Sequence, residues 1–241
     1  MNRFIETAKA LYRDRYSGAS VVFAAGSFVR GEATAFSDLD LVVLYPALPH
    51  AYRESLIVEG VMVEAFVHDP ATLRHYFEAA TKKAAAALPS MVREGIELPG
   101  PNAVSEAAKR LAETVLAGGP PPLDAEEMAA RRYGLTYLID DLRDPRSPVE
   151  AHAAGAQLYE LVADFFLRSH GFWSAKGKWI PRAMHRADAP TCEKFLASFE
   201  PLFRQADPTA AIAFTEEVLD LAGGPLFDGY RRDVPPEKRK P

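Results

Sequence analysis

Two acidic residues at the start of an apolar run constrain the fold of this chain more than any other feature of the sequence. The run "DLDLVVLY" covers residues 38–45, and its acids are Asp38 and Asp40. Side chains alternate between the two faces of a β-strand, so both acids share one face. Val42 and Leu44 continue that face as buried apolar positions. A carboxylate beside a buried face is costly unless it has a partner. The run therefore predicts a β-strand whose first residues lie where the sheet meets solvent and where the two acids meet a cation.

A third acid interrupts another apolar run further along the chain. In "VMVEAFV", Glu64 shares a strand face with Met62 and Phe66. If this strand lies beside the first, all three carboxylates converge on one spot. Magnesium prefers oxygen ligands and usually takes only one or two carboxylates, with phosphates and waters completing its shell. The three carboxylates could therefore hold two metal ions, one that activates an attacking oxygen and one that binds a triphosphate.

A turn of small residues precedes the acidic pair. Gly26 ends the expected strand 20–26, Ser27 follows it, and "SFVRGEA" is compatible with a short helical turn. A helix N-terminus offers free amides to an anion, and glycine lets the backbone approach a phosphate closely. The guanidinium group of Arg30 adds several N–H hydrogen-bond donors suited to a phosphate. The stretch is neither a P-loop, which needs Gly-Lys-Ser/Thr, nor a dinucleotide-binding GxGxxG motif.

These residues together resemble a known signature. The stretch "GSFVRGEATAFSDLDLVV", followed by Glu64 in "VEAF", resembles the signature of the nucleotidyltransferase superfamily, which combines Gly-Ser, Asp-x-Asp and a third carboxylate on a later strand. The subgroup it most resembles is that of bacterial small-molecule nucleotidyltransferases, including aminoglycoside nucleotidyltransferases, which append a helical domain to the catalytic one. The resemblance covers residues 20–70 and rests on architecture alone in the second half of the chain.

The resemblance implies a role for each matching residue. It implies that the Gly-Ser turn binds the triphosphate of ATP or another NTP, that the Asp-x-Asp pair binds Mg²⁺, and that the third carboxylate completes the metal site or acts as base. The pairs Arg30–Gly31 and Ser37–Asp38 match further elements of the pattern. The expected catalytic and metal-binding residues are Asp38, Asp40 and Glu64, and the expected nucleotide-binding residues of this half are Gly26, Ser27, Arg30 and Ser37.

Two stretches of the second half carry weaker signals. "WSAKGKWIPR", residues 173–182, interleaves tryptophans with basic residues, so Lys178 is a candidate triphosphate ligand. The alternative is an ordinary loop between helices. "LIDDLRD" contributes three acids, and in some aminoglycoside nucleotidyltransferases an acid of the helical domain is the general base. The base therefore stays open between Glu64 and the set Asp140, Asp141 and Asp144, with a solvated acidic face as the alternative for that set.

The order of elements predicts an α+β fold, in which a mixed sheet of nucleotidyltransferase type with flanking helices is followed by an all-α bundle. The β signal ends before the Gly/Pro cluster 118–122. We expect a catalytic domain over 1–119, a helical bundle over 120–230 and a charged tail over 231–241. Periodicity and capping residues place the helices of the first half at 3–15, 71–87 and 104–116, and those of the second half at 124–144, 147–171, 189–205 and 207–224.

Charge and composition narrow the class of protein. The chain has 28 basic and 33 acidic residues, a net charge of −5, so no overall basic field supports nucleic-acid binding and no nucleic-acid partner is expected. Its one cysteine, Cys192, fits a reducing compartment. No run approaches the roughly 20 apolar residues of a membrane span, and the start of the chain lacks a signal-peptide core. We therefore expect a cytoplasmic protein without a membrane partner.

The function that these observations favour is transfer of a nucleotidyl group, AMP from ATP in the first instance, to a hydroxyl of a small-molecule acceptor such as an aminoglycoside. The rival hypothesis is an antitoxin-type or non-catalytic nucleotide-binding module of a toxin–antitoxin pair. Such modules are usually short and lack a helical domain, so the long second half argues against that hypothesis. The sequence leaves open the acceptor, the preferred nucleotide and the oligomeric state, including a homodimer.

Overall fold

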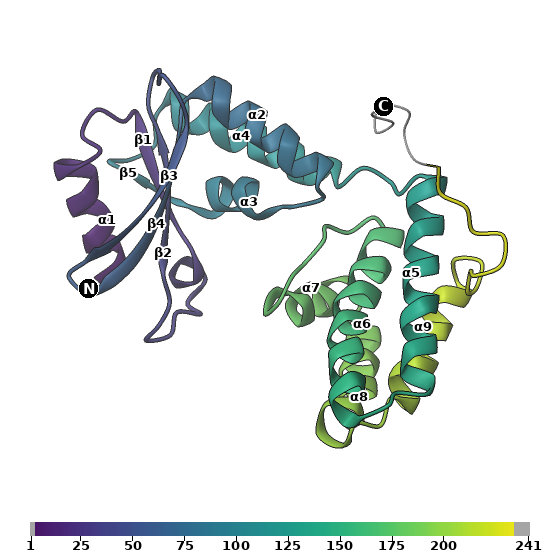
Figure 1. Cartoon of the computed structure of the whole chain (residues 1–241). Helices are drawn as coiled ribbons and strands as arrows, with labels where there is room; N and C mark the ends of the chain where they lie inside the picture. The colour runs from purple at the N-terminus through teal and green to yellow at the C-terminus, as the bar shows by residue number, and fades with distance from the viewer. Residues whose placement is uncertain (1–2, 234–241) are drawn as a thin grey trace, which may run out of the picture. The chain divides into compact units, whose positions relative to one another are not determined.

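The computed structural model describes residues 3–233 and divides after Pro120 into two compact units. The first unit contains a β-sheet with helices, and the second unit is helical (Figure 1). The division falls within the Gly/Pro cluster 118–122. The assignment of 1–119 and 120–230 as separate domains stays a prediction, and the predicted tail 231–241 lies outside the described residues from position 234 onward.

A mixed five-stranded sheet forms the centre of the first unit (Figure 1). The strand order is β3-β4-β2-β1-β5. The β2–β4 pair is parallel, whereas β1–β2, β1–β5 and β3–β4 are antiparallel. This architecture confirms the predicted mixed sheet. The strands are β1 (Val21–Ala25), β2 (Leu39–Leu44), β3 (Tyr52–Val58), β4 (Val61–His68) and β5 (Ile96–Leu98).

Strand β3 was not predicted from the sequence. It forms a hairpin with β4 through Glu59 and Gly60, whose φ angles of 49° and 77° give the left-handed turn that tight hairpins prefer. Alternate β3 residues are exposed, and the strand lies at the edge of the sheet. Charged residues such as Arg53 and Glu54 are typical of edge strands. Because they interrupt the apolar pattern, the β3 segment contains no apolar run from which a strand could be predicted.

Helices cover both faces of the sheet. Helix α1 (Arg3–Asp14) packs on the face that carries Leu39 and Leu41, and the opposite face, with Val42 and Leu44, packs against three other helices. The predicted alternation along β2 is therefore confirmed. The helices on the second face are α2 (Pro70–Lys82), α3 (Ala87–Glu94) and α4 (Ala103–Gly118).

The predicted single helix over 71–87 was wrong in its second half. Helix α2 begins as expected, with Asp69 forming a capping box with Thr72 and Pro70 at the first position. It ends at Lys82, because Ala84 adopts a left-handed conformation with φ of 52° that an α-helix does not tolerate. The chain then starts helix α3 at Ala87.

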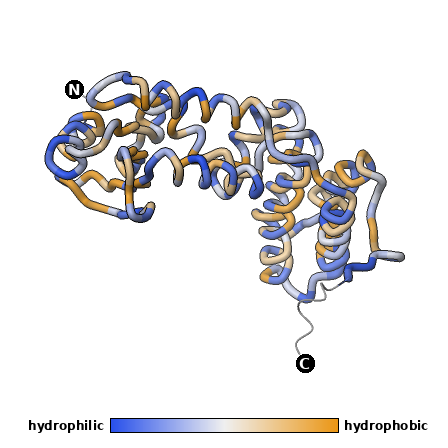
Figure 2. Tube along the Cα trace, turned by 90° about the horizontal axis from the view of Figure 1, so that it is seen from above, coloured by the Kyte–Doolittle hydropathy of each residue, from blue (hydrophilic) through white to orange (hydrophobic). Residues whose placement is uncertain are grey.

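The second unit is built of helices (Figure 1). They pack around one apolar core. Three of them begin at a side-chain cap, Asp124, Ser147 or Asp188, as the sequence indicated. In Figure 2 these helices alternate between hydrophobic and hydrophilic stretches, as amphipathic helices do. The helices are α5 (Ala125–Arg143), α6 (Pro148–Ser169), α7 (Trp179–Ala187), α8 (Ala189–Gln205) and α9 (Thr209–Asp220).

Helix α7 was missed because its sequence looked like a basic loop. It buries only Ile180 and Met184, and Pro181 stands in its first turn, where proline is tolerated. Residues 173–178 do form the expected connection between helices. Within residues 3–233, no helix has the length and apolar character needed to cross a membrane.

The burial of His68 predicts a loss of stability in mild acid. The ring ends β4 with 4% exposure, against the edge of Tyr76, and burial lowers the pKa of His68. The unfolded chain takes up this proton near pH 6.5, whereas the folded chain resists it, so the folded state loses stability as the pH falls below that value. We expect the midpoint temperature of thermal unfolding to fall as the pH is lowered from about 7.5 to 5.5, and to fall more steeply in the native protein than in the His68→Leu variant. Circular dichroism measures this midpoint. Equal slopes would contradict this assignment.

Candidate active site

Three carboxylates converge at the end of the β2–β4 pair. In the parallel register, Asp40 lies directly opposite Glu64, and Asp38 immediately precedes β2. One carboxylate oxygen of each residue lies within 4.8 Å of the others, and all three residues are half-buried. The strand pairing that the sequence left conditional is therefore present, and it brings together acids that are 24 positions apart, from Asp40 to Glu64.

The Gly-Ser turn lies beside this cluster and is hydrogen-bonded to the loop before Asp38. Gly26 follows β1, and residues Ser27–Arg30 form a short 3₁₀ helix, the helical turn expected from the sequence. The Ser27 hydroxyl donates to Ser37 Oγ at 3.0 Å. Ser37 Oγ also accepts from the backbone N–H of Thr34 at 2.8 Å. The two serines predicted at the nucleotide thus join the turn to the loop that delivers the acids.

Gly26 is required by the geometry of this site. Its φ of 113° is a conformation that side chains disfavour, and an added Cβ would lie 3.2 Å from Oδ2 of Asp40 and 3.4 Å from the carbonyl oxygen of Asp38. We expect Gly26→Ala to weaken metal-dependent nucleotide binding roughly tenfold or more, because a methyl group would displace the Asp40 carboxylate from the cluster. Isothermal titration with a non-hydrolysable nucleotide measures this loss.

A second glycine offers a matched control for that prediction. Gly31 has a φ of 73°, and an added Cβ would meet no heavy atom within 4 Å. Alanine adopts this left-handed conformation at a cost of about 1 kcal/mol, so the Gly31→Ala variant should retain binding. Equal binding losses in both variants would show that strain alone, and not contact with the acids, explains the effect.

Arg30 is held within the turn by ion pairs. Its guanidinium donates to Glu94 of α3 at 2.9 Å and to Glu32 at 3.4 Å. These contacts tie the 3₁₀ helix to α3 and so support the shape of the Gly-Ser turn. A direct contact between Arg30 and phosphate stays a prediction.

The sequence analysis missed the partner of the third acid. Arg53 on β3 pairs with Glu64, with 2.5 Å between Nη2 and Oε1, and its guanidinium carbon lies 5.0 Å from the centre of the Phe66 ring. In the β3–β4 register Arg53 lies opposite Phe66, two residues from Glu64 on the same face. The sequence does show an arginine in the segment before the "VEGVMVE" run. That arginine indicates a partner for Glu64 only once its segment is known to be a strand, β3, that pairs with β4.

Lys178 belongs to the second unit. It is exposed and immediately precedes helix α7. Within the same stretch, the guanidinium carbon of Arg182 lies 4.8 Å from the Trp179 ring, a cation–π contact. A role for Lys178 at the nucleotide stays a prediction.

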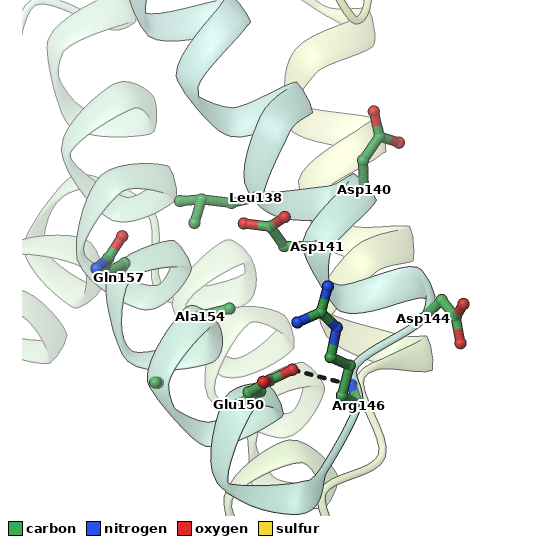
Figure 3. Close-up of a pocket in the computed structure, with 9 residues that line it drawn as sticks. Leu138, Asp140, Asp141, Asp144, Arg146, Glu150, Ala154 and Gln157 are labelled. Carbon is green, nitrogen blue, oxygen red and sulfur yellow. Dashed lines mark hydrogen bonds between the residues drawn. The ribbon is translucent and has the colours of Figure 1, made fainter.

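A pocket of about 450 Å³ lies within the second unit, between α5 and α6 (Figure 3). In Figure 3, Asp141 points toward α6, whereas Asp140 and Asp144 point away from it. Asp140 pairs with Arg143 at 2.6 Å. The sequence placed Asp144 on the helix, but α5 ends at Arg143 and Asp144 is the residue after it. A base role for any of the three stays a prediction. The pocket is lined by Leu138, Asp140, Asp141, Asp144, Arg146, Glu150, Ala153, Ala154 and Gln157.

The donor set of the carboxylate cluster fits a hard divalent cation. All three donors are carboxylate oxygens, the ligand type that Mg²⁺ prefers over imidazole or thiolate. Mg²⁺ usually takes only one or two protein carboxylates and leaves coordination positions for phosphates and water. Three carboxylates that converge beside the start of a 3₁₀ helix are compatible with one or two such ions.

Comparisons with known proteins found one family model and a set of solved structures. Residues 3–84 match the family model of the nucleotidyltransferase domain. Among solved structures, the chain is similar to a nucleotidyltransferase-like protein from Exiguobacterium sibiricum 255-15, with 14% sequence identity and a TM-score of 0.45, over 90% of this chain and 77% of that one. No curated protein matches the sequence significantly.

Proposed function

We propose, from the premise that residues 3–84 form a domain of the nucleotidyltransferase superfamily, that this chain moves a nucleoside monophosphate from a nucleoside triphosphate to a hydroxyl of a small-molecule acceptor. The observation that carries the proposal is the cluster of Asp38, Asp40 and Glu64, whose oxygens lie within 4.8 Å of one another beside the Gly-Ser turn. AMP transfer from ATP is the first reaction to test.

The three acids would hold two Mg²⁺ ions in this reaction. When bound, the ions neutralise charge on the α-phosphate and pyrophosphate and lower the pKa of the attacking hydroxyl. Asp38 and Asp40 reach the site from the start of β2, and Glu64 reaches it from β4, so the rigid sheet fixes the spacing of the donors. A site built on paired strands keeps its geometry without reorganising during the reaction.

The Gly-Ser turn would hold the β- and γ-phosphates. The Ser27 hydroxyl and the backbone amides at the start of the 3₁₀ helix are donors suited to an anion. The Ser27 hydroxyl donates its one proton to Ser37 in this structure, so it would turn away from Ser37 to donate to a phosphate. Arg30, paired with Glu94 and Glu32, keeps the turn in place. Lys178 is a further candidate for the triphosphate, supported only by its charge and by its neighbouring aromatic residues.

The acceptor class to test first is a cationic, aminoglycoside-like molecule. The pocket of the second unit is lined by four acids and by Arg146, and of these acids Asp141 points toward α6 while Asp140 is paired with Arg143. Such a lining favours a polyamine over an anionic acceptor by electrostatic complementarity. This charge balance supports the proposal for the acceptor, which otherwise rests on the resemblance of the first unit.

A pyrophosphate-release screen tests the proposal. Each of the four common nucleoside triphosphates is incubated with Mg²⁺ and a panel of hydroxyl-bearing acceptors that includes aminoglycosides. We expect pyrophosphate release that depends on acceptor and metal, and an acceptor mass increased by one nucleoside monophosphate. Nucleotide binding without turnover on any acceptor would instead support the non-catalytic module. Absence of any metal-dependent nucleotide binding would overturn the proposed site.

A further inference from the structure

We propose that Arg53 acts as a counter-ion at the metal site. When no cation is bound, Arg53 pairs with Glu64, and this pairing lowers the affinity of the carboxylate cluster for divalent cations. The inference rests on the proposed function, because it assumes that the three carboxylates bind metal. It concerns a residue to which neither the sequence pattern nor the family match assigns a role.

The contacts of Arg53 place its charge beside the carboxylate of Glu64. Its Nη2 lies 2.5 Å from Oε1 of Glu64, and its guanidinium carbon lies 5.0 Å from the centre of the Phe66 ring. One face of the guanidinium therefore rests on an aromatic ring while its edge meets the carboxylate. This combination of stacking and ion pairing is a geometry that arginine makes and lysine does not reproduce.

The charges of the cluster explain why an arginine is needed there. Three carboxylates whose oxygens lie within 4.8 Å of one another repel each other at neutral pH. Arg53 offsets part of that repulsion in the metal-free protein. A divalent cation brought to the same oxygens meets the positive charge of Arg53 and competes with it for Oε1 of Glu64. The same residue that stabilises the empty cluster therefore opposes metal binding.

The position of Arg53 allows it to leave the carboxylate. It lies on β3, the edge strand, and its side chain is 55% exposed, whereas that of Glu64 is 33% exposed. Exposed ion pairs contribute little to stability, commonly about 1 kcal/mol or less, so the Arg53–Glu64 pair can be exchanged for a metal bond at small cost. Phe66 offers a surface on which the guanidinium can remain once Glu64 binds a cation.

Titration of the full chain with Mn²⁺ in the absence of nucleotide tests the proposal. Free Mn²⁺ is followed by electron paramagnetic resonance at fixed ionic strength. We expect Arg53→Gln to bind Mn²⁺ roughly five- to tenfold more tightly than the native protein, because a positive charge a few ångströms from the ion is removed. A residue with a purely structural role would weaken metal binding when replaced, so the direction of the change is diagnostic. Unchanged or weaker binding would overturn the proposal.

Two further variants make the test specific. Arg15 pairs with Glu54, the neighbour of Arg53 on β3, on the opposite face of the sheet, so Arg15→Gln removes the same charge away from the cluster. We expect Arg15→Gln to bind Mn²⁺ as the native protein does, and an equal gain in this control would refute the local interaction. In a Glu64→Gln background, the gain from Arg53→Gln should shrink, because the competition for the Glu64 carboxylate is gone and only the repulsion by the Arg53 charge remains.

The same titration separates failure of this inference from failure of the proposed function. If the native protein binds Mn²⁺ and Arg53→Gln binds it no more tightly, the counter-ion role is wrong and the metal site stands. If neither protein binds Mn²⁺, with or without a non-hydrolysable ATP analogue, the metal site itself is wrong and the counter-ion role falls with it.

Discussion

Replacing Asp40 by asparagine is expected to reduce nucleotidyl transfer roughly a thousandfold or more while leaving the fold intact. Asparagine keeps the shape of the side chain but removes the negative charge that a divalent cation requires. Asp40 is the central acid of the cluster, opposite Glu64 in the sheet and next to Gly26 of the turn. The measurements are the rate of pyrophosphate release with the best acceptor and the Mg²⁺-dependent affinity for a non-hydrolysable nucleotide.

An acid on the other face of the same sheet serves as the control for Asp40→Asn. Glu54 of β3 accepts from Arg15 and from the Tyr16 hydroxyl, away from the carboxylate cluster. The Glu54→Gln variant should lose some stability, since its hydrogen bonds with Arg15 lower the pKa of Glu54, but should retain turnover. Turnover in Asp40→Asn above about a tenth of the native rate would contradict a role as metal ligand.

Replacing Gly155 by valine is expected to destabilise the second unit by about 3 kcal/mol. Gly155 lies in the middle of α6, where α8 approaches closely. An added Cβ would lie 2.5 Å from Cδ2 and 3.0 Å from Cγ of Leu202, a fully buried residue that has little room to move. Both tryptophans, Trp173 and Trp179, belong to the second unit, so their fluorescence during denaturant unfolding reports on this unit.

Another helical glycine gives the matched control for Gly155→Val. Gly134 lies within α5, and an added Cβ there would meet no heavy atom within 4 Å. Valine has a slightly better helix propensity than glycine, so Gly134→Val should leave stability within about 0.5 kcal/mol of the native value. Similar losses in the two variants would show that helix propensity, and not the contact between α6 and α8, controls the result.

The residues that the fold brings together at the candidate site were easier to single out from the sequence than the elements around them. The acids, the Gly-Ser turn and Ser37 were identified because each is an unusual residue in an otherwise regular pattern. A carboxylate at the start of an apolar run is conspicuous, because burying an unpaired charge costs free energy. Helix α7 and strand β3 gave no such contrast. Both are short or exposed elements whose residues bury little, and only packing against the rest of the unit stabilises them.

Local sequence determined the strands that carry the acids, the faces on which those acids lie and the caps that start the helices, because these depend on neighbours a few positions away. Tertiary structure alone decided the rest. The parallel pairing that places Asp40 opposite Glu64, and the edge strand that brings Arg53 to Glu64, depend on contacts between separate segments. Register between strands follows from the packing of whole faces, which no short stretch of sequence encodes by itself.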